Sequence, residues 1–249
     1  MQVLLFLHRL YFFVILNIRN KKTYKMKKII FLFIISSLIS IKGIGLTLSP
    51  ETEVSILTCA PGNELYSLFG HTAIRINDPR HQIDRVYNYG TFDFSTPHFY
   101  LKYARGLLPY QLTVQKFSHF IYNYQLEERT VYAQTIRLDS LEKQRIFDLL
   151  EENLLPQNRY YLYNFLFDNC TTRSRDILLK SLPDSVAWNM PDVNKNFWNL
   201  LDEYLQASPW VQWGIHTILG QRGNRTATTF QYMFLPDYLM YGLKNARYD

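Results

Sequence analysis

Cys170 stands at a position where a thiol gains reactivity. It lies in "FLFDNCTTRSRD", where an apolar run gives way to a helical pattern. A thiolate is stabilised at a helix start, because unpaired backbone N–H groups and the helix dipole favour negative charge there. Arg173 and Arg175 follow in the sequence and are expected to favour the thiolate further. Since amides of the first turn also suit an oxyanion hole, the segment predicts a nucleophilic cysteine.

His71 is the expected general base. It follows Gly70 in "YSLFGHTAIRI", and alternation along this predicted strand places His71, Ala73 and Arg75 on one face. The glycine has no side chain, which allows a close approach of the backbone before the histidine. A histidine at a strand start that faces a cysteine at a helix start is a common way to build a thiol–imidazole pair.

A third group should orient the imidazole from the neighbouring strand. Asn88 in "RVYNYG" is the predicted residue, with Asp84 and Asp93 behind it. Glu64 and Ser67, shortly before the histidine, either cap a short helix or touch substrate. The residues expected to bind substrate or to support the pair are Glu64, Ser67, Arg75, Asn169 and Arg173.

The two cysteines also leave a structural alternative open. Cys59 and Cys170 are the only cysteines in the sequence, and an exported protein with two cysteines commonly joins them in a disulfide. Cys59 can equally be a small buried apolar side chain at a strand end. The histidines and cysteines show no metal-ligand spacing such as His-x-x-x-His or Cys-x-x-Cys, so neither a metal site nor a cofactor is expected.

Basic residues are concentrated at the N-terminus. The formal net charge is +6, but eight of the 27 Lys and Arg residues lie in residues 1–50, which hold no acidic residue. The rest of the chain has 19 basic against 21 acidic residues, a net charge of −2, so no nucleic-acid partner is expected. The stretch from Met26, "MKKIIFLFIISSLISIKGIG", has the basic start and apolar run of a secretory signal.

These patterns predict that the chain consists of two parts. Residues 1–45 are expected to be an over-extended start followed by a signal peptide, or an uncleaved membrane anchor, with Met26 as the natural start. Residues 46–249 are expected to form a single periplasmic domain.

The elements expected after residue 46 do not alternate regularly. Extended segments are predicted at 53–60, 71–78 and 84–94 and at two places within 118–139. Helical turns are predicted at 64–70 and in parts of 188–207. A helix capped by Asp139 and Glu142, with Leu141 on its apolar face, should end before Pro156, and another should run from Cys170 to Leu182. This arrangement favours an α+β fold, with an antiparallel sheet packed against helices.

Four blocks of the sequence together resemble a known family. "SILTCAPGNELYSLFGHTAIRI", "NYGTFDF", "YNFLFDNCTTRSRDIL" and "MFLPDYLM" are similar to the N-terminal periplasmic domain of the Lnb-type lipoprotein N-acyltransferases. The resemblance covers about residues 46–249 and implies a permuted papain-like fold of the NlpC type, with the histidine before the cysteine. It implies Cys170 as the nucleophile and His71 as the base.

The chemistry that the resemblance implies is thiol-based acyl transfer. Cys170 would take a fatty acyl group from a phospholipid as a thioester, and the N-terminal cysteine amine of a lipoprotein would attack it. The expected partners are a phospholipid donor, a lipoprotein acceptor and the membrane surface; the sequence does not indicate an oligomeric state. The alternatives are a periplasmic NlpC-type cysteine peptidase or amidase, and a non-catalytic envelope domain locked by a Cys59–Cys170 disulfide.

Members of this family typically continue into C-terminal membrane helices. No apolar stretch of about 20 residues follows residue 45 in this sequence. The sequence is therefore expected to be either a fragment of such an enzyme or a soluble relative with another substrate.

Overall fold

The computed structural model describes residues 45–93, 95–98, 102, 107–182, 186–191 and 194–247. Residues 47–249 form one compact unit. The segment predicted as a signal or anchor lies outside the described residues, except for Gly45. Among the helices that are described, none combines the length and the apolar character needed to cross a membrane.

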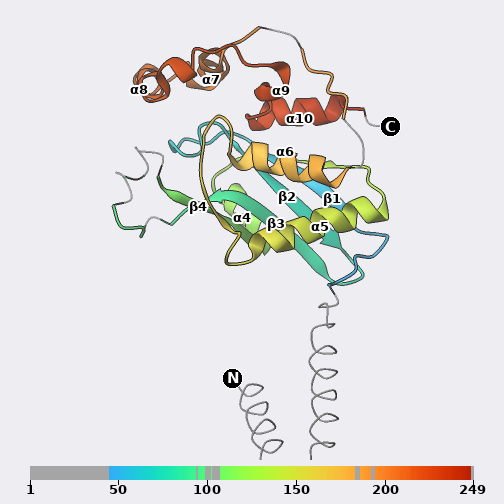
Figure 1. Cartoon of the computed structure of the whole chain (residues 1–249). Helices are drawn as coiled ribbons and strands as arrows, with labels where there is room; N and C mark the ends of the chain where they lie inside the picture. Colours follow the sequence, from blue (N-terminus) through green and yellow to red (C-terminus); the bar gives the residue numbers. More distant parts are fainter. Residues whose placement is uncertain are drawn as a thin grey trace, which may run out of the picture. The chain divides into compact units, whose positions relative to one another are not determined.

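An antiparallel sheet of six strands forms the centre of this unit (Figure 1). The strands lie in the order β5-β1-β2-β3-β4-β6, and every neighbouring pair runs antiparallel. They are β1 Glu53–Cys59, β2 His71–Asp78, β3 Ile83–Thr91, β4 Pro109–Lys116, β5 Val131–Thr135 and β6 Tyr160–Leu162. With the helices described next, the sheet confirms the predicted α+β class.

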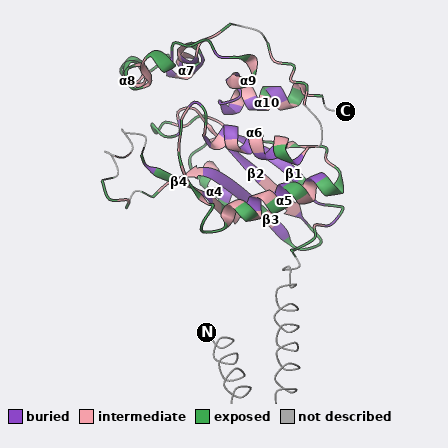
Figure 2. Ribbon diagram, viewed as in Figure 1, coloured by how far each residue is buried: buried purple, intermediate pink, exposed green. Residues whose placement is uncertain are grey.

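Helices cover both faces of the sheet. α5 (Ser140–Leu154) and α6 (Cys170–Ser181) pack on one face, and α4 (Phe117–Leu126) packs on the other (Figure 1). The central strands are consequently buried on both sides, as the purple colour in Figure 2 shows. The remaining helices are α7 Phe197–Leu205, α8 Pro209–Leu219, the 3-10 turn η1 Gly220–Arg222, α9 Thr229–Tyr232 and α10 Pro236–Asn245.

The apolar core is divided by the sheet. Ile56 and Ile74 belong to the cluster on the side of α5 and α6, whereas Leu57 and Ala73 belong to the cluster on the side of α4. A further cluster joins α7 to the segment 232–235 and to the inner side of α8. The burial of alternate residues on opposite faces follows from the period of two along a strand.

The two helices predicted at 140–155 and 170–182 are confirmed. α5 begins directly after Asp139, which forms a capping box with Glu142. α6 begins at Cys170 and has Leu182 as its C-terminal cap residue. Leu141 was expected on the apolar face of α5 but is 69% exposed, because the face of α5 that packs on the core presents Ile146, Phe147 and Leu150.

Two other expectations are wrong. Residues 64–70 form a hydrogen-bonded turn rather than helical turns, and the first part of 118–139 is α4 rather than an extended segment. The apolar residues of α4 recur at helical spacing, which is the signal that would have identified the helix. They are Phe117, Phe120, Ile121 and Tyr124.

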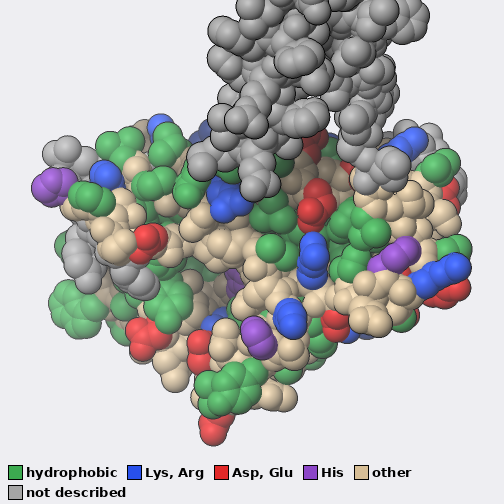
Figure 3. Space-filling model, turned by 90° about the horizontal axis from the view of Figure 1, so that it is seen from below, with side chains coloured by type: hydrophobic (Ala, Val, Ile, Leu, Met, Phe, Trp, Pro, Cys, Tyr) green, Lys and Arg blue, Asp and Glu red, His purple; other side chains and the backbone are tan. Residues whose placement is uncertain are grey.

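Charged side chains of both signs are interspersed on the face of the molecule that Figure 3 shows. Surface ion pairs of this unit include Arg85 with Glu151 and Lys195 with Glu203. Exposed pairs of this kind contribute little to stability, at most about 1 kcal/mol each. The fold therefore depends on the apolar clusters more than on its surface charges.

Candidate active site

α6 begins where it does because the Asn169 side chain caps it. Its Oδ1 accepts hydrogen bonds from the N–H groups of Thr171 and Thr172, at 2.8 and 2.9 Å, and the Thr172 hydroxyl accepts from the Asn169 N–H. The Asn169 Nδ2 donates to the carbonyl oxygens of Phe165 and Phe234. This buried side chain thus uses its polar groups to hold the helix start, and none of them is left for a substrate.

β2 and β3 separate at the end of the sheet that faces the start of α6. The two strands pair from Ile74 onward along β2, and β3 shifts register after Asn88. Beyond the paired part, the backbone N–H of Thr72 acts on Cys170 and helps to lower the pKa of its thiol. Gly90 of β3 has a positive φ of 85°, and a Cβ there would lie 3.4 Å from the Cβ of Cys170. The glycine therefore lets the strand run beside the thiol.

His71 reaches this thiol from the first position of β2. Its imidazole acts on the pKa of the Cys170 thiol, and the thiol acts on the pKa of the imidazole. The Nε2 of His71 lies 3.3 Å from Oδ1 of Asn88. Since an amide oxygen only accepts, Nε2 carries a hydrogen and donates it. In the neutral ring Nδ1 is then the unprotonated nitrogen that can take the thiol proton.

Strand register brings Asn88 to the imidazole. Ile74 pairs with Tyr87, so Asn88 lies on the same face of the sheet as Ala73 and His71. The structure therefore brings together the three residues predicted as catalytic. The alternatives to Asn88 are engaged elsewhere: Asp84 pairs with Arg75, and Asp93 accepts a hydrogen bond from the Ser95 N–H in an exposed turn.

The electrostatics favour a thiolate–imidazolium pair. Burial raises the pKa of Cys170, but the charge of His71 and its hydrogen bond, with smaller contributions from the Thr72 N–H and the Thr171 hydroxyl, bring that pKa below its ordinary value. Burial lowers the pKa of His71, but the charge and hydrogen bond of Cys170 and the hydrogen bond to Asn88 raise it above its ordinary value. Both shifts have the sign that a nucleophilic thiol requires.

Cys59 differs from Cys170 in its surroundings and in the direction of its pKa shift. Both cysteines are free thiols, so the disulfide considered as an alternative is not formed in this structure. Cys59 is completely buried at the end of β1, and burial raises its pKa to about 12. Its thiol consequently stays protonated at neutral pH. Its carbonyl oxygen would lie 2.6 Å from a Cβ at Gly70, so the close approach expected for this glycine is made to β1.

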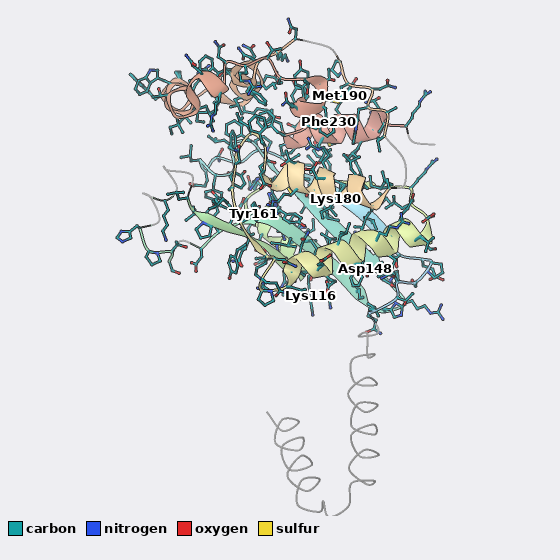
Figure 4. The ribbon with its side chains drawn as sticks, in the orientation of Figure 1. Lys116, Asp148, Tyr161, Lys180, Met190 and Phe230 are labelled. Atoms are coloured by element: carbon teal, nitrogen blue, oxygen red, sulfur yellow. The ribbon has the colours of Figure 1, made fainter. Side chains whose placement is uncertain are left out.

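The arginines of α6 each pair with an aspartate. Arg173 forms two hydrogen bonds to the carboxylate of Asp168, at 2.6 and 2.8 Å, and Arg175 pairs with Asp176. Each positive charge is therefore compensated by its own partner. The guanidinium groups also stack on aromatic rings, those of Tyr161 and Phe230, which Figure 4 labels.

The other residues predicted to bind substrate lie outside the cavity described below. Glu64 is exposed in the turn before β2, and the Ser67 hydroxyl donates to its carbonyl oxygen. Arg75 forms a two-pronged ion pair with Asp84, at 2.7 and 2.9 Å. These side chains stabilise the turn and the strand pair that carry His71 and do not touch Cys170.

A cavity of about 330 Å³ opens at the Cys170–His71 pair. Its polar lining comes from His71, Asn169, Cys170 and Thr171, and the rest is apolar or aromatic. The apolar walls come from the turn before β2, the start of β4, residues 163–165, α8 and residues 234–236. The volume lies at the lower end of the range for small-molecule sites. Sequence reasoning did not assign α8 or residues 234–236 to the site, although "MFLP" is a run of apolar residues.

One backbone amide remains for an oxyanion. The N–H groups of Thr171 and Thr172 are bound by the Asn169 cap, and that of Arg173 donates to the Asn169 carbonyl oxygen. Among the hydrogen bonds between described residues, the Cys170 N–H has no acceptor. The oxyanion hole expected from the first turn is therefore reduced to this amide, which is adjacent to the sulfur.

A family model described as the Lnb N-terminal periplasmic domain matches residues 47–201. The chain belongs to this family. The match confirms the resemblance drawn from the sequence motifs. No curated protein and no solved structure gives a significant match to the chain. The range of the Lnb match contains His71, Asn88 and Cys170, whereas α8 and residues 234–236 complete the cavity from beyond it.

Proposed function

We propose that this Lnb-type domain is a cysteine-dependent N-acyltransferase. It moves a fatty acyl group from a phospholipid to the N-terminal cysteine amine of a lipoprotein through a thioester on Cys170. One observation carries the proposal: a thiol with a lowered pKa, paired with His71, faces an apolar cavity.

In the first half-reaction the Cys170 thiolate attacks the carbonyl carbon of a phospholipid ester. A C–S bond forms and the ester carbonyl becomes an oxyanion, which the Cys170 N–H is placed to stabilise. When the oxyanion collapses, the acyl C–O bond breaks. The His71 imidazolium gives its proton to the departing alkoxide, so lysophospholipid leaves and a thioester with neutral His71 remains.

In the second half-reaction an uncharged lipoprotein amine attacks the thioester carbonyl. A C–N bond forms, neutral His71 takes a proton from the amine, and the C–S bond breaks. The products are the amide and the original thiolate–imidazolium pair, so each step balances. Asn88 holds the ring through Nε2 in both steps, which keeps Nδ1 directed at the reacting atoms.

The cavity supports an acyl group more than a polar peptide. Its walls are formed by Leu, Ile, Phe, Tyr and Pro side chains, and a polar peptide buried against such walls would lose hydrogen bonds to water. The walls also restrict the access of water, which would hydrolyse the thioester. A cysteine peptidase of the NlpC type needs the same thiol–imidazole pair and is therefore the outcome against which the proposal is tested.

Location and fold form part of the proposal. The family is described as periplasmic, in agreement with the export segment proposed for residues 1–45 and with residues 46–249 as the exported domain. The order of histidine before cysteine, with the cysteine at a helix start and the histidine at a strand start, supports the permuted papain-like arrangement.

The deciding experiment incubates the purified protein with a phospholipid donor and then with a diacylated lipopeptide. We expect an acyl adduct on Cys170 that hydroxylamine removes, and transfer of the acyl group to the lipopeptide amine. Cys170→Ser should abolish both and retain the fold by circular dichroism, while Cys59→Ser serves as the matched thiol control. Cleavage of cell-wall peptide without an adduct would assign the peptidase instead. Full activity of Cys170→Ala would refute either thiol mechanism.

A further inference from the structure

α8 carries an unpartnered apolar face next to the cavity. No residue of this helix is buried, which Figure 2 shows as exposed and intermediate colours along its length. Trp210, Trp213 and Ile218 are 86%, 66% and 74% exposed. Trp210, Trp213 and Thr217 share one side of the helix, because residues three and four apart lie on the same face. The opposite side packs on α7 through Val211, Ile215 and Leu219.

Charged residues follow this apolar face in the sequence rather than interrupt it. α8 contains no Asp, Glu, Lys or Arg, and its His216 is held by Asp202 of α7 and stacked on Trp198. Two exposed arginines, Arg222 and Arg225, follow directly after the helix. Apolar and indole groups beside exposed cations are the combination that binds the interface of an anionic bilayer.

The same helix also forms a wall of the cavity. Ile215, Ile218 and Leu219 line it, and the opposite part of the lining includes Leu65 and Tyr66, which are 55% and 59% exposed. An acyl chain that enters past α8 therefore meets a continuous apolar surface from outside the protein to Cys170.

We infer that α8 docks on the lipid bilayer and holds the mouth of the cavity against it, with Trp210 and Trp213 in the interface and Arg222 and Arg225 on lipid phosphates. This inference rests on the proposed function for the reason that a lipid should enter, but the docking is measurable without the reaction. The occupant is a bilayer rather than a second copy, because Arg222 and Arg225 complement lipid phosphates, and because the helix leads into the cavity.

The test places an environment-sensitive NBD fluorophore on α8 in the full chain. Cys170→Ala removes the reactive thiol and Cys59 is completely buried, so Thr217→Cys provides the labelling site and Ser140→Cys, exposed at the start of α5, is the matched control. With phosphatidylcholine–phosphatidylglycerol vesicles, we expect the probe at 217 to shift to the blue and to be quenched by nitroxide acyl chains, and the probe at 140 to do neither.

Substitutions test the contributions of the tryptophans and of the arginines to docking separately. Trp210→Ser with Trp213→Ser should lower the quenching at 217 to the level at 140, whereas Leu141→Ser, an equally exposed apolar residue on α5, should leave it unchanged. Arg222→Gln and Arg225→Gln should each weaken binding of α8 to phosphatidylglycerol vesicles roughly fivefold, and should not affect pure phosphatidylcholine.

The outcomes distinguish docking from catalysis. Docking is overturned when the probe at 217 stays in water with vesicles, or when it shifts with protein concentration in their absence, which would assign the face to a second copy. An acyl adduct formed in detergent by a wild-type chain whose α8 does not dock would leave the proposed function intact. Docking without any adduct on Cys170 would support α8 and reject the acyltransferase.

Discussion

α5 and α6 both begin with a capping box, but the cap residue is an acid in α5 and an amide in α6. Asp139 caps α5 by accepting a hydrogen bond from one amide of the first turn, and Asn169 caps α6 by accepting from two; each is reciprocated by a side chain three residues on. Asp139 is exposed, and its acidic side chain compensates the positive end of α5. Asn169 is buried and neutral, so the positive end of α6 is left for the thiolate of Cys170.

The same capping pattern can therefore have two different roles. At α5 the hydrogen bonds of the Asp139 side chain that the described residues show lie within the first turn of the helix. At α6 the cap also fixes the residue after it, because Asn169 is tied by its Nδ2 to the segments of Phe165 and Phe234. Those two segments line the cavity, so the cap positions nucleophile and cavity together.

The largest change in the reactivity of Cys170 should come from removing His71, the positively charged partner of the thiolate at the start of α6. In the wild type, the rate of thiol alkylation by iodoacetamide should decline as pH falls through the lowered pKa of Cys170. In His71→Ala the raising effect of burial is no longer offset by His71, so that pKa should rise to about 8.5 or above, which leaves roughly 3% or less of the thiol ionised at pH 7 and slows alkylation accordingly. Stopped-flow pH profiles measure this. His119→Ala, on the exposed side of α4, is the control, and an unshifted profile in His71→Ala would show that the helix start alone activates the thiol.

A smaller change in the reactivity of Cys170 should follow when the cap residue of α6 is replaced by an aspartate, the cap residue of α5. Asn169→Asp keeps the oxygen that accepts the two amides but adds a negative charge beside Cys170, which should raise the thiol pKa by about one unit and move the alkylation pH profile to higher pH by the same amount. Asn169→Ala loses the cap without adding a charge.

Both substitutions lose the hydrogen bonds to the carbonyl oxygens of Phe165 and Phe234 and should reduce the free energy of unfolding, by about 1–3 kcal/mol. Only the aspartate should shift the pH profile. Equal profiles in the two variants would mean that the neutrality of the cap has no part in activating the thiol.

The smallest effect, a loss of stability alone, should come from removing the cap residue of α5. Asp139→Ala should lower the free energy of unfolding by about 1 kcal/mol, because an amide of the first turn loses its acceptor. Denaturant titration measures this loss. The alkylation profile of Cys170 should not change, and a shifted profile would show that the two helix starts are coupled.

Local signals account for what the sequence predicted well. Asp139 with Glu142 marks one helix start, and the polar DNCTT segment after an apolar run marks the other. These signals lie within four residues of the elements they define. The Phe-Gly-His and Asp-Asn-Cys motifs likewise identified the residues of the pair, and the family match agrees with the resemblance they carry.

What the sequence left unresolved depends on distant contacts. α4 was missed because its many aromatic residues suit strands as well as helices. The pairing of Arg173 and Arg175 with neighbouring aspartates depends on rotamers, and the contribution of α8 and residues 234–236 to the cavity depends on how the C-terminal segments fold back. The helical spacing of the apolar residues of α4 is a local pattern, but the pairing of the arginines and the composition of the cavity are not encoded in one.

The opposite environments of the two thiols turn the domain into its own folding reporter. His71 and Cys170 are far apart in sequence and meet only when β2 and α6 pack, while Cys59 becomes inaccessible only when α4 covers β1 and β2. On unfolding, one thiol should therefore lose its excess reactivity while the other gains access to reagents. A two-site labelling ratio followed by mass spectrometry would report the integrity of each face of the sheet separately, in a chain carrying no foreign probe.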